Sequence, residues 1–217
     1  MKTDRELQEN VLEELDWEPS LDASHIGVEV RDGVVTLQGK VESYAQKWAA
    51  ERAAKNVPGV RSLAIELEVT LPGSLKRTDT DIAMAARNAI DWNASIPRDA
   101  IKVVVDNGWI TLSGNVEWAF MRNAAESAVR GLLGVKGVAN RITITPQIEP
   151  RNIKTRIEAA LQRRAHVDAS HIRIETNKGT VTLQGEVDSL AERDTIEQAA
   201  WSAPGVQKVV DNLTVAA

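Results

Sequence analysis

The chain repeats itself three times, and this feature constrains its fold more than any other. The pattern Leu-x-Gly occurs at residues 37–39, 112–114 and 183–185, at steps of 75 and 71 residues. The same two steps align nine of the 13 glycines, three in each copy. These are Gly33, Gly39, Gly59, Gly108, Gly114, Gly134, Gly179, Gly185 and Gly205. So many matches at fixed offsets indicate an internal triplication.

Each copy has the pattern helix, strand, strand, helix, strand. In the first copy Leu7, Val11 and Leu15 are spaced by four, which places them on one face of a helix. Apolar and polar residues then alternate over residues 26–30 and 34–38, and this period of two predicts two half-buried strands. An alanine-rich stretch predicts a second helix that lies close to the sheet, and a last alternating stretch predicts a third strand.

The repeated glycines mark the turns. Between the first two strands lie Asp32-Gly33, Asn107-Gly108 and Lys178-Gly179. We expect hairpin turns there with positive φ at the glycine, which has no Cβ to oppose that conformation. At the end of the second helix we expect Gly59, Gly134 and Gly205 to act as left-handed caps.

The fold class predicted from these patterns is α+β. We expect three tandem small modules, each helix-strand-strand-helix-strand, with two helices packed on a three-stranded mixed sheet. The modules are predicted at 3–71, 79–146 and 151–216. The linkers at 72–74 and 146–150 are short and contain prolines. Since such linkers restrict motion, we expect the modules to contact one another.

The pattern resembles the BON domain, a family named after bacterial osmotic-stress and nodulation proteins. In the first copy the resemblance lies in Ile-x-Val-x-Val at 26–30, Asp-Gly at 32–33, Val-x-Leu-x-Gly-x-Val at 35–41, Ala-Ala at 53–54, Pro-Gly-Val at 58–60 and Leu-x-Val at 67–69. It recurs in all three copies. It implies bacterial, usually tandem, non-enzymatic modules. Many members are periplasmic or lipid-anchored, some bind anionic phospholipid, and a cytoplasmic relative senses potassium.

Composition excludes several kinds of site. The chain has no Cys, so disulfides, thiolate catalysis and sulfur-ligated zinc are excluded. The net charge is −5 and no long basic stripe occurs, which argues against nucleic acid as a partner. His25 and His171 are equivalent, and we expect each to belong to a local Asp-Ser-His turn with Asp22 or Asp168 rather than to a metal site. His166 adds no metal-ligand spacing. No catalytic residue, metal site or cofactor is expected.

The six tryptophans differ between the copies. Trp17 and Trp92 are equivalent, with Arg163 in the third copy, whereas Trp48, Trp109, Trp118 and Trp201 have no Trp counterpart. We expect Trp109 and at least one of the other three to lie at contacts between modules, because residues that break the repeat are not needed by the module fold. The alternative is a ligand surface. Its candidates, on the second copy with its net charge of +2, are Arg87, Trp92, Lys102 and Trp109.

Three functions remain open. The first is a non-enzymatic, stress-associated binding or scaffold protein. The alternatives are a phospholipid-surface binding protein in envelope maintenance and a cytoplasmic cation or small-ligand sensor. The partner is then membrane phospholipid or another protein, and the sequence leaves the oligomeric state open. The first residues show no signal-peptide pattern, so we expect a cytoplasmic location for the chain as written and a periplasmic one if a leader was removed.

Overall fold

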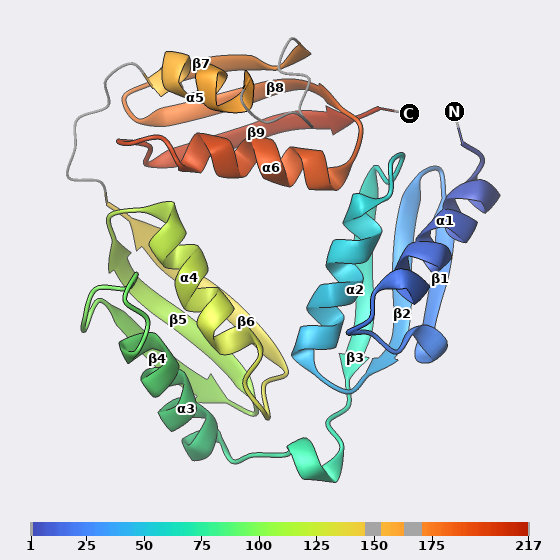
Figure 1. Ribbon diagram of the computed structural model, residues 1–217, viewed down its shortest axis with the longest axis vertical. Helices are drawn as coiled ribbons and strands as arrows, with labels where there is room; N and C mark the ends of the chain where they lie inside the picture. Colours follow the sequence, from blue (N-terminus) through green and yellow to red (C-terminus); the bar gives the residue numbers. More distant parts are fainter. Residues whose placement is uncertain (1, 146–152, 163–170, 217) are drawn as a thin grey trace. The chain divides into compact units, whose positions relative to one another are not determined.

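The computed structural model describes residues 2–145, 153–162 and 171–216 (Figure 1). Within them it contains six helices and three separate three-stranded sheets, which confirms the predicted tandem α+β modules. By its internal contacts the chain divides into two compact units, one with most of the first and third modules and one with the second. No helix in the described part is both long and apolar enough to cross a membrane.

The elements follow the predicted order in every copy. The first module contains α1 (Asp4–Trp17), β1 (Ile26–Arg31), β2 (Val34–Val41), α2 (Tyr44–Asn56) and β3 (Ser62–Val69). The second contains α3 (Asp79–Asp91), β4 (Ile101–Asp106), β5 (Trp109–Val116), α4 (Ala119–Arg130) and β6 (Gly137–Ile144). The third contains α5 (Ile153–Gln162), β7 (Arg173–Asn177), β8 (Thr180–Val187), α6 (Leu190–Trp201) and β9 (Lys208–Val215).

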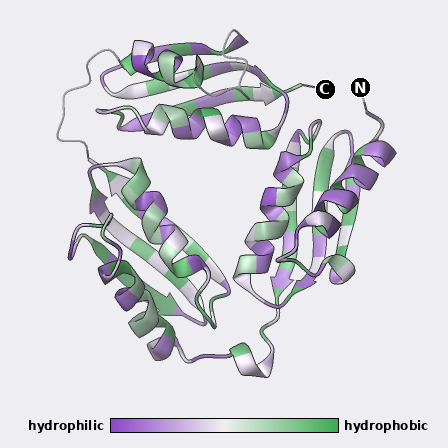
Figure 2. Cartoon of the chain, in the orientation of Figure 1, coloured by the Kyte–Doolittle hydropathy of each residue, from purple (hydrophilic) through white to green (hydrophobic). Residues whose placement is uncertain are grey.

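Each sheet places its second strand in the centre. The first two strands pair antiparallel, and in the second and third modules the central strand pairs parallel with the last. The helices cover one face of the sheet (Figure 1). Apolar and polar residues alternate in bands along these elements (Figure 2). The inward residues form the core, which in the second module includes Ile82, Ala86, Ile110, Leu112 and Val129, each at most 1% exposed.

The hairpin turns have the predicted backbone. In the second module Asn107 and Gly108 have φ of 50° and 81°, and the equivalent residues of the other modules also have positive φ. Two successive positive φ values are typical of a type I′ turn, whose twist matches that of the flanking strands. Asp79, at the start of α3, accepts hydrogen bonds from the backbone N–H of Asn107 (2.7 Å) and of Gly108 (2.9 Å). Asp4 does the same for Asp32 and Gly33.

The glycines predicted as helix caps lie beyond the helix ends, so that prediction is wrong. Helix α2 ends at Asn56, three residues before Gly59, and α4 and α6 end four residues before Gly134 and Gly205. The three glycines have positive φ between 87° and 96°. Each is the third residue of a turn closed by a hydrogen bond, as from the N–H of Val60 to the C=O of Val57. Positive φ at this position is typical of a type II turn.

The glycine that ends the Leu-x-Gly pattern is required by a close backbone approach. At Gly114, φ is 143°, and a Cβ would lie 2.0 Å from the carbonyl oxygen of Ala100, the residue just before the neighbouring strand β4. The equivalent distances at Gly39 and Gly185 are 2.1 and 2.3 Å, to the backbone of His25 and His171. No other residue fits there without displacing the first strand.

Candidate functional site

The four predicted surface residues of the second module do not form one site. Arg87 and Trp92 lie on α3 and at its C-terminal end, on the helix-covered side of the sheet. Lys102 and Trp109 lie on β4 and β5, at positions that alternate with the buried Ile101 and Ile110. They therefore point to the opposite side, and the structure divides the candidates into two pairs.

Arg87 is already paired within its own module. Its guanidinium lies 3.0 Å from a carboxylate oxygen of Asp91 and 3.3 Å from one of Asp99. Trp92, beside it at the helix end, is 89% exposed. The two carboxylates offset the charge of Arg87 and so weaken its attraction for an anionic ligand.

The face of the second sheet that the helices leave uncovered has a different character. It is formed by the outward residues of its three strands, and we call it the outer face of the second sheet. Strand register places Trp109 beside Asp106 and Gly137, and Val104 beside Thr111. Its members include Lys102, Val104, Asp106, Trp109, Thr111, Ser113, Ala139, Arg141 and Thr143. Val104 is 60% and Trp109 53% exposed.

The charge of this face is carried by two cations and one carboxylate. Lys102 and Arg141 both lie in the row of Ser113, one on each side of it. Among the described residues neither has a salt-bridge partner. The face thus combines a half-exposed indole, an exposed valine and two unpaired cations, with Asp106 at its far end.

The equivalent faces of the other two modules are polar. In the first module Glu29 stands where the second has Val104, and Val34 where it has Trp109. In the third module these positions are Glu175 and Thr180. The outer face of the second sheet is therefore the one that departs from the repeat, and it departs towards an apolar, basic surface.

Trp109 is positioned by a glycine outside the repeat. A Cβ at Gly137 would lie 2.4 Å from the Trp109 ring, so the six-membered part of the indole covers the Gly137 backbone. The strand pairing of these two residues brings the ring there. The ring therefore packs on the Gly137 backbone, while the Trp109 side chain stays about half exposed. The predicted inter-module role of Trp109 stays a prediction.

The start of α4 is a further exposed surface, formed by Phe120, which the sequence did not indicate, and by Trp118, which it indicated only as a candidate contact between modules. The second helix begins with Ser43 in the first module and Ser189 in the third, and each hydroxyl accepts a backbone N–H of the first turn. In the second module Trp118 occupies the cap and makes no side-chain cap hydrogen bond. Its ring centre lies 6.5 Å from that of Phe120, which is 55% exposed. Loss of a serine cap costs about 1 kcal/mol, so this substitution does not serve helix stability.

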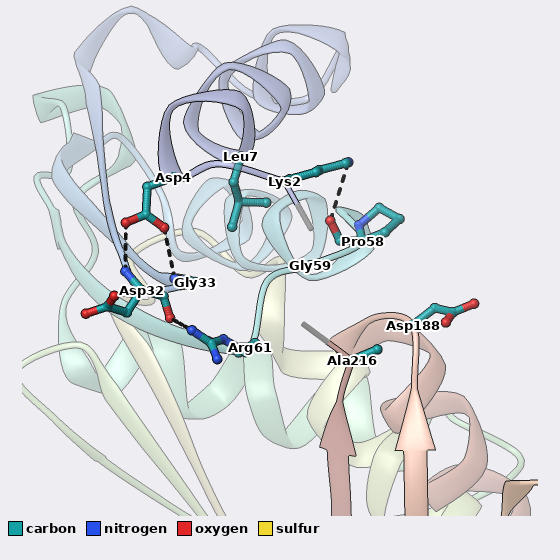
Figure 3. A pocket seen from close by; sticks show the side chains of 10 residues that line it. All are labelled: Lys2, Asp4, Leu7, Asp32, Gly33, Pro58, Gly59, Arg61, Asp188 and Ala216. Carbon is teal, nitrogen blue, oxygen red and sulfur yellow. Dashed lines mark hydrogen bonds between the residues drawn. The ribbon is translucent and has the colours of Figure 1, made fainter.

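A pocket of about 440 Å³ is lined by residues of the hairpin and helix termini of the first module and by Asp188 and Ala216 of the third (Figure 3). Several of its polar groups have partners within the chain. Asp4 accepts the backbone N–H groups of the hairpin, the Lys2 ammonium donates to the carbonyl of Pro58, and Arg61 donates to the carbonyl of Asp32 (Figure 3). The arrangement ties the turn to the helix and leaves little for a ligand.

The predicted Asp-Ser-His turn is present in the first module. Asp22 accepts hydrogen bonds from the Ser24 hydroxyl (2.6 Å) and backbone N–H (3.1 Å), and the Ser24 hydroxyl lies 2.8 Å from Nδ1 of His25. The hydrogen bonds from Ser24 lower the pKa of Asp22. In the third module Asp168, like His166, lies outside the described residues. Within the described part no group of three or more His, Cys, Asp or Glu is placed to hold a metal ion.

Of the remaining tryptophans, Trp48 and Trp201 each contact a residue of their own module. The guanidinium of Arg52 lies 5.0 Å from the centre of the Trp48 ring, and the Trp201 indole N–H donates to Glu197 at 3.1 Å. Trp17 is 85% exposed. The predicted contacts of Trp48, Trp118 or Trp201 between modules stay a prediction.

The chain is similar in sequence to two known bacterial proteins. The chain is 34% identical over 125 residues to osmotically-inducible protein Y of Escherichia coli, covering 56% of this chain and 62% of that protein. It is 24% identical over 139 residues to the outer membrane lipoprotein DolP of Haemophilus influenzae, covering 61% of this chain and 72% of the relative. The chain thus spans less than two thirds of the first relative's length.

Among solved structures, the C-terminal domain of CdsD, described as the structural protein of the type III secretion system of Chlamydia trachomatis, aligns over all of both chains at 12% identity and a TM-score of 0.27. The model of the BON domain matches the chain three times, at residues 3–70, 78–146 and 151–217. The chain therefore belongs to the BON domain family and contains three BON domains in tandem.

Proposed function

We propose that the chain is a non-enzymatic binding protein of the bacterial envelope that acts under osmotic stress. Its family membership supports a non-catalytic role. One relative is named an osmotically inducible protein and the other an outer membrane lipoprotein. The cytoplasmic location expected from the first residues is not supported by these relatives, and the periplasmic alternative is consistent with them.

The observation that carries the proposal is the departure of one face from the repeat. Three equivalent sheet faces share one backbone, and the outer face of the second sheet alone combines Val104 and Trp109 with the cations Lys102 and Arg141. Residues that vary while the fold is kept are free to serve binding. We therefore assign the binding surface to this face.

The ligand that fits this face is an anionic phospholipid surface. An indole is stable at the boundary between headgroups and acyl chains because the ring is amphipathic. Burying about 100 Å² of Trp109 contributes about 2–3 kcal/mol at 25 cal/mol per Å². A cation near an anionic membrane adds about 1 kcal/mol. Lys102 and Arg141 together add about twice that, and Asp106 offsets part of it. The expected binding is weak and salt-dependent.

The test is flotation of the full chain with vesicles of phosphatidylglycerol and phosphatidylcholine, and with vesicles of phosphatidylcholine alone. We expect binding to the anionic vesicles at low salt and its loss in Trp109→Thr, which installs the residue found at the equivalent position of the third module. The matched control is Val34→Thr, at the same position of the first sheet, and it should bind normally.

Flotation that is absent at low salt, or that Trp109→Thr leaves unchanged, would contradict phospholipid binding at this face. A second measurement is a pull-down from stressed cells with the parent chain and with Trp109→Thr. If Trp109→Thr floats normally but no longer recovers an envelope protein that the parent chain recovers, the partner is a protein, and the stress-associated scaffold function replaces the lipid one.

A further inference from the structure

The outward side of α1 carries a line of residues that the fold does not use. Asn10, Glu13, Glu14 and Trp17 stand at i, i+3, i+4 and i+7, so they lie on one face of the helix, and we call them the α1 stripe. Together with the end of α2 they line a groove of about 490 Å³. The other lining residues are Lys2, Asn56, Val57 and Pro58. The whole groove belongs to the first module.

Five of the six acidic residues of α1 fall into two groups. One group holds the module together: Asp4 binds the hairpin, Glu6 caps the helix, and Glu9 pairs with Arg5 at 3.0 Å. Glu13 and Glu14, on the α1 stripe, have no hydrogen-bond or ion-pair partner among the described residues. Beside them Trp17 is 85% exposed, so its indole buries little in its own module.

The repeat gives the same stripe on the first helix of each module, with a different charge each time. In the second module the four positions are Ala85, Asn88, Ala89 and Trp92. In the third the described positions are Arg156, Ala159 and Ala160. The stripe is therefore acidic and aromatic in the first module and neutral and aromatic in the second, and in the third its one charged described residue is an arginine.

The equivalent face of α5, formed by Arg156, Ala159 and Ala160, is called the α5 stripe. We propose that the α1 stripe of one copy of the chain binds the α5 stripe of a second copy. The two surfaces complement each other chemically. A guanidinium such as that of Arg156 pairs with the carboxylates of Glu13 and Glu14 and stacks on an indole face such as that of Trp17. Ala159 and Ala160 are small, so they let the two helices approach closely.

Each copy carries both members of the pair, so two identical contacts can form around one two-fold axis. The contact uses the first and third modules, whereas the proposed lipid surface lies on the second. The self-association therefore stands or falls independently of the proposed function.

The experiment is sedimentation equilibrium of the full chain over a range of protein concentrations, at low salt and at high salt. Surface charges are screened beyond about 10 Å at 0.1 M salt, so we expect association that grows with protein concentration at low salt and weakens at least severalfold at high salt. The Trp emission should shift to shorter wavelength as the chain associates.

Charge reversal tests the two stripes directly. E13R/E14R and R156E should each associate at least tenfold more weakly than the parent chain. An equimolar mixture of the two variants should associate again, because the basic α1 of one variant meets the acidic α5 of the other and the two unchanged stripes also meet. The matched control is Asn88→Arg, at the Glu13 position of the second module, which should leave association unchanged. Circular dichroism and the melting temperature show whether each variant is folded.

Two results would overturn the proposal. One is a chain that stays monomeric at every concentration at low salt, which includes the case in which α1 and α5 pair within one copy. The other is association that persists in folded E13R/E14R.

Discussion

The first and second modules share their backbone and differ in their surfaces. Both begin with a threonine-capped helix whose first Asp binds the hairpin, at Asp4 and at Asp79. The first module has acidic helix and sheet surfaces, whereas the second exposes Val104, Trp109 and Phe120. The comparison teaches that turns, caps and core carry the fold, and that surface residues change between copies without altering it.

The largest expected effect concerns a glycine that every module needs. Gly114→Val places a Cβ 2.0 Å from the carbonyl oxygen of Ala100 at φ of 143°. Such a clash combined with backbone strain should lower the free energy of unfolding of the second module by about 3 kcal/mol or more. Urea unfolding followed by Trp fluorescence measures this.

Its control is Gly131→Ala, since Gly131 has a φ of −92° and a Cβ there meets nothing within 4 Å. That variant should stay within about 0.5 kcal/mol of the parent. Equal stability of the two variants would show that Gly114 is not required by the strand contact.

An intermediate effect is expected at the aspartate that ties α3 to the hairpin. Asp79→Ala removes the acceptor of the Asn107 and Gly108 N–H groups and should cost about 1–2 kcal/mol. Asp4→Ala should cost a similar amount in the first module. The third copy has Pro150 at this position, so its hairpin lacks this carboxylate. Hydrogen exchange of the hairpin amides reports the loss, and unchanged exchange in Asp79→Ala would argue against the interaction.

The smallest effect concerns pH and the helix caps. Hydrogen bonds from the Thr78 hydroxyl and backbone lower the pKa of Asp81, and those from the backbone and hydroxyl of Thr3 lower the pKa of Glu6. A carboxyl with a lowered pKa stabilises the fold above its unfolded pKa, and this contribution is lost as the pH falls through the folded pKa. Stability of the first two modules should therefore decline in acid.

Asp81→Asn should reduce that acid-dependent decline, as measured by urea unfolding between neutral and acidic pH. The third module has Asn152 at the equivalent position and serves as the internal reference. If Asp81→Asn leaves the pH dependence of stability unchanged, the Asp81 cap does not cause the loss of stability in acid.

The fold could be predicted from the sequence because its signals are local and occur three times. Two-residue turns with Asp-Gly and Asn-Gly specify hairpins, and the spacing of Leu7, Val11 and Leu15 specifies a helix face. The helix ends were harder to place. Pro58-Gly59 and Pro204-Gly205 are typical of the two central residues of a type II turn. Such a turn begins one residue before the proline, so the helix must end before it, as α2 and α6 do.

The candidate site could be predicted only in part. Lys102 and Trp109 share a face, as alternation in paired strands allows. Arg87 does not belong with them, because it lies on α3, on the helix-covered side of the sheet. Its ion pair with Asp99 was also not predicted, because Asp99 lies in a turn outside the helix. The Trp118 surface could have been found by comparing the three helix starts, since serine stands at that position in the other two copies.

The measurement that tests the central claim most directly is transfer of the binding face between modules. In a chain whose outer face is made polar by V104E/W109T, the changes G27K/E29V/V34W/S62G/E66R give the first sheet the apolar and basic residues of the second, together with the glycine that its indole covers. Binding to phosphatidylglycerol vesicles should be lost in V104E/W109T and recovered in the combined chain. Binding retained by V104E/W109T, or not recovered by the transfer in a folded chain, would contradict the assignment of binding to this face.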